Sequence, residues 1–250
     1  MAARHAFAPG GYAYLEGGFP YSCGAIALPG HRLVRARFRR PPAIASGFEA
    51  IAAHLRAAGR PLTALCAAEL RSPAPFTLDG FKGFNVGYVE VLRSWGLHDQ
   101  GRNPVARSNV CPVHAPPSEP VFHAFCYTVP DAAGGPADYA VAGSGEWPED
   151  QPFPEGIVAR GDVSPAGMAA KAAYVLHTMR ERVEGLGGDW SRITASQVYT
   201  ARDLGALIDG HFAASGLLQA GLTWHVCRPP IRELEFEMDL RSLGTELVLD

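Results

Sequence analysis

No stretch of this sequence is apolar over the roughly 18 residues that a membrane-spanning helix needs. The first 18 residues, MAARHAFAPGGYAYLEGG, also lack the continuous apolar core of a secretory signal peptide. The five cysteines are an odd number at irregular spacing, which argues against a disulfide framework and favours free thiols in a reducing compartment. We therefore expect a cytoplasmic protein.

Excess charge of either sign is small as well. The formal net charge is -3, so the chain has neither the basic surface that binds nucleic acid nor a polybasic patch for anionic membranes. Its 250 residues are 47% hydrophobic and 19% charged, which is typical of a globular protein with one large domain or two small ones. The function must therefore be sought in individual residues.

A recognisable set of metal ligands is also missing. His225 and Cys227 are two residues apart and would share one face of a strand. A metal site needs three or four ligands, however, and neither His211 nor the cysteines of the first half offer a matching second pair. We therefore expect no metal.

The order of predicted elements occurs twice along the chain. Each half begins with strand patterns, continues through two helices separated by a strand, and ends with two strands. In the first half we expect strands at 21–28, 31–38, 62–70, 106–113 and 120–129, and helices at 45–59 and 77–96. In the second half we expect strands at 139–147, 157–164, 193–201, 222–227 and 233–240, and helices at 165–187 and 203–216.

The segment PDAAGGPAD between the two halves is rich in proline, glycine and alanine and is the best domain boundary in the chain. The sequence thus predicts an α+β fold made by tandem duplication of a β-β-α-β-α-β-β domain, with the helices on one face of each sheet. The two domains would span residues 1–130 and 137–250, and segments 21–28 and 31–38 would pair around a turn.

Short motifs in both halves resemble the RidA/YjgF family of enamine and imine deaminases. The second half resembles it from residue 172 to 212. In the first half, FPYSCGA with Tyr21, FNVGY with Asn85 and ARSNVCPV with Arg107 are similar to three family motifs. The second half has the glycine loop GSGEW and the strand LEFE with Glu235.

The resemblance implies a role for each of these positions. Arg107 would clamp a substrate carboxylate, supported by Tyr21 and Asn85, with Asn85 also assisting catalysis. Glu235 would be the acid–base residue. Ser144 and Gly145 would bind substrate through the glycine loop, and Cys111 lies beside the expected pocket. Because each half has only part of the set, we expect a site shared between the first and the second domain type.

The alternation of acids in RELEFEMDLR leaves two interpretations open. Glu233, Glu235, Glu237 and Asp239 would share one strand face, which is either a solvated face or the wall of a cleft. The family register favours Glu235 as the acid that acts.

Two-domain chains of this kind are similar to 2-aminomuconate deaminases. The resemblance implies hydrolysis of an enamine dicarboxylate to a keto acid and ammonia without a cofactor, in trimers of two-domain chains. A second carboxylate calls for a second cation, and Arg102, Arg228 and Arg232 are equal candidates. Two alternatives stay open: a non-catalytic regulator that binds ketoacids, and a chorismate-type enzyme on the same fold.

Overall fold

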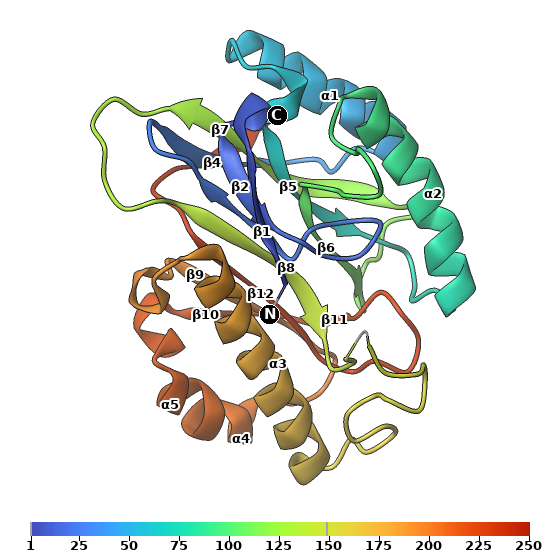
Figure 1. The fold of residues 1–250 in the computed structure, drawn as a ribbon. Helices are drawn as coiled ribbons and strands as arrows, with labels where there is room; N and C mark the ends of the chain where they lie inside the picture. Colours follow the sequence, from blue (N-terminus) through green and yellow to red (C-terminus); the bar gives the residue numbers. More distant parts are fainter. Residues whose placement is uncertain (1, 149) are drawn as a thin grey trace.

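The strands of the chain form two sheets, seen in the computed structural model between helices on either side (Figure 1). The structure describes residues 2–148 and 150–250. The seven-stranded sheet contains, in spatial order, β1 (Arg4–Phe7), β2 (Tyr12–Leu15), β3 (Gly24–Ala27), β8 (Tyr139–Gly145), β12 (Glu237–Ser242), β9 (Ala195–Tyr199) and β10 (Leu222–His225). The six-stranded sheet contains β11 (Cys227–Arg228), β6 (Ala106–Pro112), β5 (Leu65–Arg71), β7 (Val121–Pro130), β4 (His31–Phe38) and β13 (Glu246–Leu249).

The expected duplication is visible in the strand order. The run β4-α1-β5-α2-β6-β7 gives the spatial order β6-β5-β7-β4, and the run from β8 to β12 gives the matching order β10-β9-β12-β8. In both sheets the pair joined by the second helical connection is parallel, as a helical crossover between neighbouring strands allows. The α+β fold with tandem repeats is therefore confirmed, and the repeated unit is β-α-β-α-β-β.

Three long helices form where the sequence places apolar residues three and four apart. Their bounds are α1 (Ile44–Ala57), α2 (Leu78–Ser94) and α3 (Pro165–Leu186). The hydroxyls of Thr77 and Ser164 accept the backbone N–H groups of Gly80 and Gly167, and so cap α2 and α3. The last helical region consists of α4 (Gly205–Leu207), a π-helical turn (Ile208–Phe212) and α5 (Ala213–Ser215).

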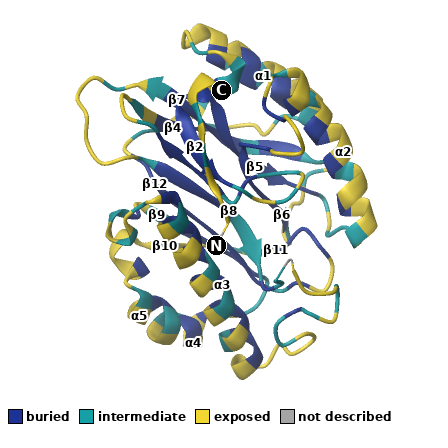
Figure 2. Ribbon diagram, viewed as in Figure 1, coloured by how far each residue is buried: buried dark blue, intermediate teal, exposed yellow. Residues whose placement is uncertain are grey.

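Apart from the edge strands β1, β10 and β13, the sheets are buried on both faces (Figure 2). Helices α1 and α2 cover the outer face of the six-stranded sheet, whereas α3 to α5 cover that of the seven-stranded sheet. The inner faces meet in a layer of small and aromatic side chains that includes Tyr12, Ala67, Ala106 and Ala140. All seven residues of β5 are consequently buried, which explains its nearly continuous apolar sequence.

The two sheets exchange strands across the predicted domain boundary. The predicted pairing of 21–28 with 31–38 is wrong, because β3 pairs with β2 and β8, and β4 pairs with β7 and β13. Segment 157–164, expected as a short strand, forms turns instead. The boundary does fall between β7 and β8, which lie in different sheets, and the division into domains 1–130 and 137–250 stays a prediction.

In the described parts of the chain, no helix combines the length and the apolar character needed to cross a membrane.

Candidate active site

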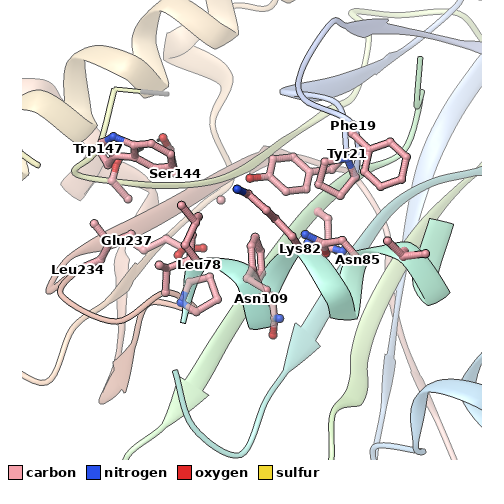
Figure 3. Close-up of a pocket in the computed structure, with 18 residues that line it drawn as sticks. Phe19, Tyr21, Leu78, Lys82, Asn85, Asn109, Ser144, Trp147, Leu234 and Glu237 are labelled. Atoms are coloured by element: carbon pink, nitrogen blue, oxygen red, sulfur yellow. Dashed lines mark hydrogen bonds between the residues drawn. The ribbon is translucent and has the colours of Figure 1, made fainter. Parts of the chain in front are cut away.

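A cavity of about 390 Å³ lies where the two sheets meet, and both halves of the chain line it. Helix α2 and strand β6 come from the first half, the end of β8 and the start of β12 come from the second, and two loops complete the walls (Figure 3). The lining residues are Phe19, Pro20, Tyr21, Leu78, Phe81, Lys82, Asn85, Val86, Arg107, Asn109, Gly143, Ser144, Gly145, Trp147, Pro230, Ile231, Leu234 and Glu237.

Five of the residues predicted from the sequence lie in this one cavity. They are Tyr21, Asn85, Arg107, Ser144 and Gly145. The first three come from the first half of the chain and the last two from the second, and all belong to a single chain. The structure therefore brings together the elements that the shared-site hypothesis combines.

Arg107 is the most unusual of these residues, because its guanidinium is buried without a carboxylate. Its side chain is on the face of β6 that packs against α2, and only 3% of the residue is exposed. One nitrogen, Nη2, donates to the amide oxygen of Asn85 at 2.7 Å, whereas Nη1 has no partner among the described residues. Burial lowers the pKa of Arg107.

Aromatic rings surround the Arg107 guanidinium in place of an acid. Its central carbon lies 4.8 to 5.9 Å from four ring centroids, those of Tyr21, Phe81, Phe84 and Tyr88. Such contacts stabilise a cation without neutralising it. A buried cation with an unused N–H group and no counter-ion is suited to binding an anion that enters from outside.

Asn109 supplies a second unsatisfied donor on the same strand face. Its amide oxygen accepts from the Ser72 hydroxyl at 2.9 Å, which fixes the orientation of the side chain. Its amide nitrogen is buried and has no partner in the described structure. The sequence analysis missed Asn109, although its position two residues after Arg107 on a strand was a usable signal.

Glu237 is the acid that faces the cavity. It is 3% exposed, and its carboxylate makes no hydrogen bond or ion pair with the described residues. Burial raises the pKa of Glu237 well above its ordinary value, and the nearby carboxylates of Asp239 and Glu146 raise it further. The side chain therefore keeps its proton at a pH at which an exposed glutamate is ionised.

The first part of the expected glycine loop, Gly143 to Gly145, belongs to strand β8 and lies beside this acid. A side chain at Gly143 would displace the Glu237 carboxylate, so glycine at this position leaves room for it. Gly145 pairs with Glu237 in the sheet, and the Ser144 hydroxyl has only a 3.5 Å contact with the neighbouring carbonyl. The loop thus holds Glu237 in place and leaves a hydroxyl available at the cavity wall.

Glu235, the predicted acid, lies elsewhere. It forms a two-pronged ion pair with Arg202, at 2.9 and 3.0 Å, in a separate surface groove. The prediction assumed regular alternation from residue 233 onward, but β12 begins only at Glu237. Before it, Glu233 has a left-handed backbone (φ 75°), and this turn breaks the alternation. Glu237 therefore replaces Glu235 as the acid at the cavity.

A buried carboxylate holds this irregular segment in place. Glu146 is fully buried and accepts the backbone N–H groups of Glu235 and Phe236 at 2.6 and 3.0 Å. The ammonium of Lys171, also fully buried, lies 3.3 Å from the same carboxylate. Because Leu234 and Glu237 flank the clamped residues, this contact positions one wall of the cavity.

The three arginines proposed for a second carboxylate are not among the described lining residues. Arg102 lies in a pocket near the N-terminus, and Arg228 and Arg232 lie in the groove with Glu235. Cys111 is buried at the end of β6 outside the cavity, and burial raises the pKa of its thiol to about 12. The cation that does line the cavity with Arg107 is Lys82.

His225 and Cys227 are engaged separately. The His225 ring stacks on Tyr199 and its Nε2 lies 2.8 Å from the Gln197 side chain, and burial lowers its pKa to about 4. Within residues 2–148 and 150–250, no three His, Cys, Asp or Glu side chains are grouped so that they would hold a metal ion.

Comparison with known proteins places this architecture in a family. A sequence model of the family described as 2-aminomuconate deaminase CnbZ matches residues 4–247. The chain belongs to the CnbZ family. A 2-amino-5-chloromuconate deaminase of Comamonas testosteroni is 42% identical over 245 residues, which cover 97% of this chain and 98% of that protein. The resemblance to aminomuconate deaminases is thereby confirmed.

One solved structure supports the fold of this CnbZ family member. A crystal structure of chorismatase superposes with a TM-score of 0.53 at 13% identity, over 93% of this chain and 77% of that chain. The Escherichia coli YjgF gene product matches 43% of this chain and 80% of its own, with a TM-score of 0.32 and 18% identity.

Proposed function

We propose that this chain hydrolyses a 2-aminomuconate-type enamine dicarboxylate to the corresponding 2-oxo acid (or its 2-hydroxymuconate tautomer) and ammonia. The observation that carries the proposal is one cavity that contains both a buried arginine without a carboxylate partner, Arg107, and a buried acid whose pKa is raised by burial, Glu237. Membership of the CnbZ family and the 42% identity with a 2-amino-5-chloromuconate deaminase support the same reaction.

Substrate binding would begin at Arg107. Its free Nη1 and the Asn85 amide would hold the C1 carboxylate, with the Tyr21 ring against the guanidinium. The apolar walls formed by Leu78, Ile231 and other residues would then enclose the unsaturated carbon chain. This arrangement fixes C2, the carbon that bears nitrogen, beside the bound carboxylate. Binding of the carboxylate therefore also orients the reacting carbon.

Glu237 would move the protons. It first donates its proton to a carbon of the diene, and the nitrogen lone pair forms the C2=N bond of an iminium. The Glu237 carboxylate then takes a proton from the water that attacks C2, giving a carbinolamine. Glu237 returns this proton to nitrogen, the C2–N bond breaks, ammonia leaves, and the hydroxyl proton returns to Glu237 as the ketone forms. Substrate and water thus give oxo acid and ammonia, with Glu237 regenerated as an acid.

The glycine loop would serve the attacking water. The Ser144 hydroxyl at the cavity wall is positioned to accept a hydrogen bond from water, and its poor contact with its own neighbour leaves it free to do so. A raised pKa at Glu237 suits the first step, because an ionised acid would be unable to protonate the diene.

The decisive experiment replaces each of two glutamates that are close in sequence, Glu237 and Glu235, by glutamine. Glu237→Gln keeps the shape of the side chain but removes the proton, so turnover of a 2-aminomuconate should fall about a hundredfold or more. Glu235→Gln is the matched control and should change turnover little, since Glu235 pairs with Arg202 outside the cavity. The rate of ammonia release measures the turnover of both variants. Near-normal turnover by Glu237→Gln, or loss confined to Glu235→Gln, would refute the assignment.

We further propose that the chains assemble as cytoplasmic trimers. The five cysteines are all free, as a reducing compartment favours. Apolar side chains are exposed along the sheet edges, with Trp224 and Val226 at one and Leu247 and Val248 at another. Exposed edge strands of this kind are suited to burial against another copy of the chain.

A further inference from the structure

Lys82 has no structural task that accounts for its position. It is on α2, one helical turn before Asn85, and so lies on the same side of the helix. In Figure 3 its amine extends from α2 toward the middle of the cavity, between the sides that Asn85 and Ser144 occupy. Its ion pair is a 3.7 Å contact with Asp79, and both side chains are largely exposed. Such a contact is weak and leaves the ammonium available.

The charges of the lining residues match a dianion. Among the described lining residues, Lys82 and Arg107 are the only two cations, and Glu237 is the only acid. Burial of Glu237 favours its neutral form, so the two positive charges exceed the negative charge in the cavity. A monocarboxylate would neutralise only one of them.

The two cations also differ in their surroundings. Arg107 is buried at the base of the cavity, whereas Lys82 is exposed and lies at its mouth. The remaining lining is mostly apolar, as Leu78, Trp147 and Ile231 illustrate. A ligand with a carboxylate at each end and an unsaturated hydrocarbon between them places its charges on the cations and its carbons on the apolar walls.

We propose that Lys82 binds the second carboxylate of the substrate, so that Lys82 and Arg107 together select a dicarboxylate over a monocarboxylate of the same length. The inference rests on the proposed function in that it places the first carboxylate on Arg107. A flexible ammonium at the cavity mouth also suits capture of the second carboxylate before the cavity is filled.

The test compares two stable acids that differ at one end. Muconate (2,4-hexadienedioate) and sorbate (2,4-hexadienoate) have the same carbon chain, but sorbate has a methyl group where muconate has its second carboxylate. Calorimetry with the full-length chain should give at least about tenfold tighter binding of muconate, as a charge-assisted contact implies. In Lys82→Met the affinity for muconate should fall to that for sorbate, while sorbate affinity stays within about twofold.

Two further variants separate position from charge. Lys82→Arg should retain most of the preference for muconate. Arg93→Met removes one positive charge from an exposed position on the same helix, away from the cavity, and should leave the preference unchanged. Equal affinity of the wild-type chain for the two acids, absence of muconate binding, or an unchanged preference in Lys82→Met would overturn the inference.

Ammonia release from 2-aminomuconate distinguishes this inference from the proposed function. If the wild-type chain prefers muconate through Lys82 but releases no ammonia, the proposed subsite stands and the proposed deaminase function is refuted. If the wild-type chain deaminates normally but Lys82→Met keeps the preference for muconate, the proposed deaminase function stands and the proposed subsite is refuted.

Discussion

At the scale of single residues, the cavity depends on two ionisable groups that are buried without a partner of opposite charge. Arg107 is a cation buried without an acid, and Glu237 is a carboxyl group buried without a cation at hydrogen-bond distance among the described residues. It matters that Arg107 and Glu237 do not form an ion pair with each other. A direct ion pair would neutralise both groups and leave neither available to a ligand. A cavity with these two groups is suited to a substrate that carries negative charge and needs a proton.

The raised pKa of Glu237 has a measurable effect on both stability and activity. Between the ordinary glutamate pKa and the raised folded value, the folded protein binds more protons than the unfolded chain, so the free energy of unfolding should decrease as pH rises. Over the same rise, kcat/KM should fall as Glu237 loses its proton. Urea unfolding and initial rates, followed upward from about pH 4, near the ordinary glutamate pKa, measure the two trends.

Glu237→Gln provides the control, since glutamine does not titrate. Its unfolding free energy should lose that part of the pH dependence, while Glu235→Gln should keep it. Equal slopes in wild type and Glu237→Gln would contradict the raised pKa.

Several site residues were predictable because they belong to contiguous motifs. Tyr21, Asn85 and Arg107 each stand in a short segment whose pattern identifies it, and the structure brings all three to one cavity. Glu235 was chosen by counting along an assumed strand, but β12 begins only at Glu237, and the irregular segment before it places Glu235 in another groove. Lys82 was not predictable, because its role depends on which face of α2 meets the other sheet.

At the scale of elements, the segment before β12 is held by side chains from two distant parts of the chain. Glu146 follows β8 and Lys171 is on α3, and together they fix the backbone of residues 235 and 236. The sequence offered no indication of this clamp, because backbone donors are invisible to residue patterns. It explains how an irregular segment maintains a defined cavity wall.

Replacing the buried carboxylate tests the clamp. Glu146→Gln leaves Lys171 buried without its acid and weakens both backbone contacts, so the free energy of unfolding should fall by about 2 to 4 kcal/mol. Turnover should also fall, because Glu237 follows the clamped residues directly. Urea denaturation and ammonia release measure the two effects.

An exposed pair on the neighbouring segment serves as the comparison. Arg160 and Glu233 form an ion pair at 2.7 Å with both side chains partly exposed, and Glu233→Gln should change stability by less than about 1 kcal/mol. A similar loss in Glu146→Gln and Glu233→Gln would show that the clamp has no special role.

Helices were easier to predict than strand partners. The bounds of α2 and α3 match their caps, Thr77 and Ser164, because helix contacts and capping are local. Strand partners depend on contacts between residues far apart in sequence, and alternation does not say which sheet a strand joins. The failed pairing of 21–28 with 31–38 follows from that limit.

At the scale of the molecule, the cavity is built within one chain, and this makes a mixing experiment informative. Arg107→Met and Glu237→Gln should each be inactive, the first because it loses the carboxylate clamp. If both groups serve one cavity in the same chain, exchange of subunits between the two inactive variants should restore no activity. Light scattering before and after mixing should give the mass of three chains.

A control confirms that exchange occurs. Wild-type chains mixed with a tagged inactive variant should give mixed assemblies on affinity capture, with activity proportional to the wild-type content. Recovery of activity from the two inactive variants would instead place the working cavity between chains.

The exchange of strands between the sheets also governs the order in which the molecule is completed during synthesis. The strands β1 to β3 are synthesised early, but β8, the strand that pairs with β3, follows only after the whole first repeat. Likewise β4 pairs with β13, which follows the whole second repeat. Neither repeat therefore completes its sheet alone, and the nascent chain exposes open strand edges until β13 has been made. Synthesis of the second repeat and β13, rather than of the first repeat, completes both sheets.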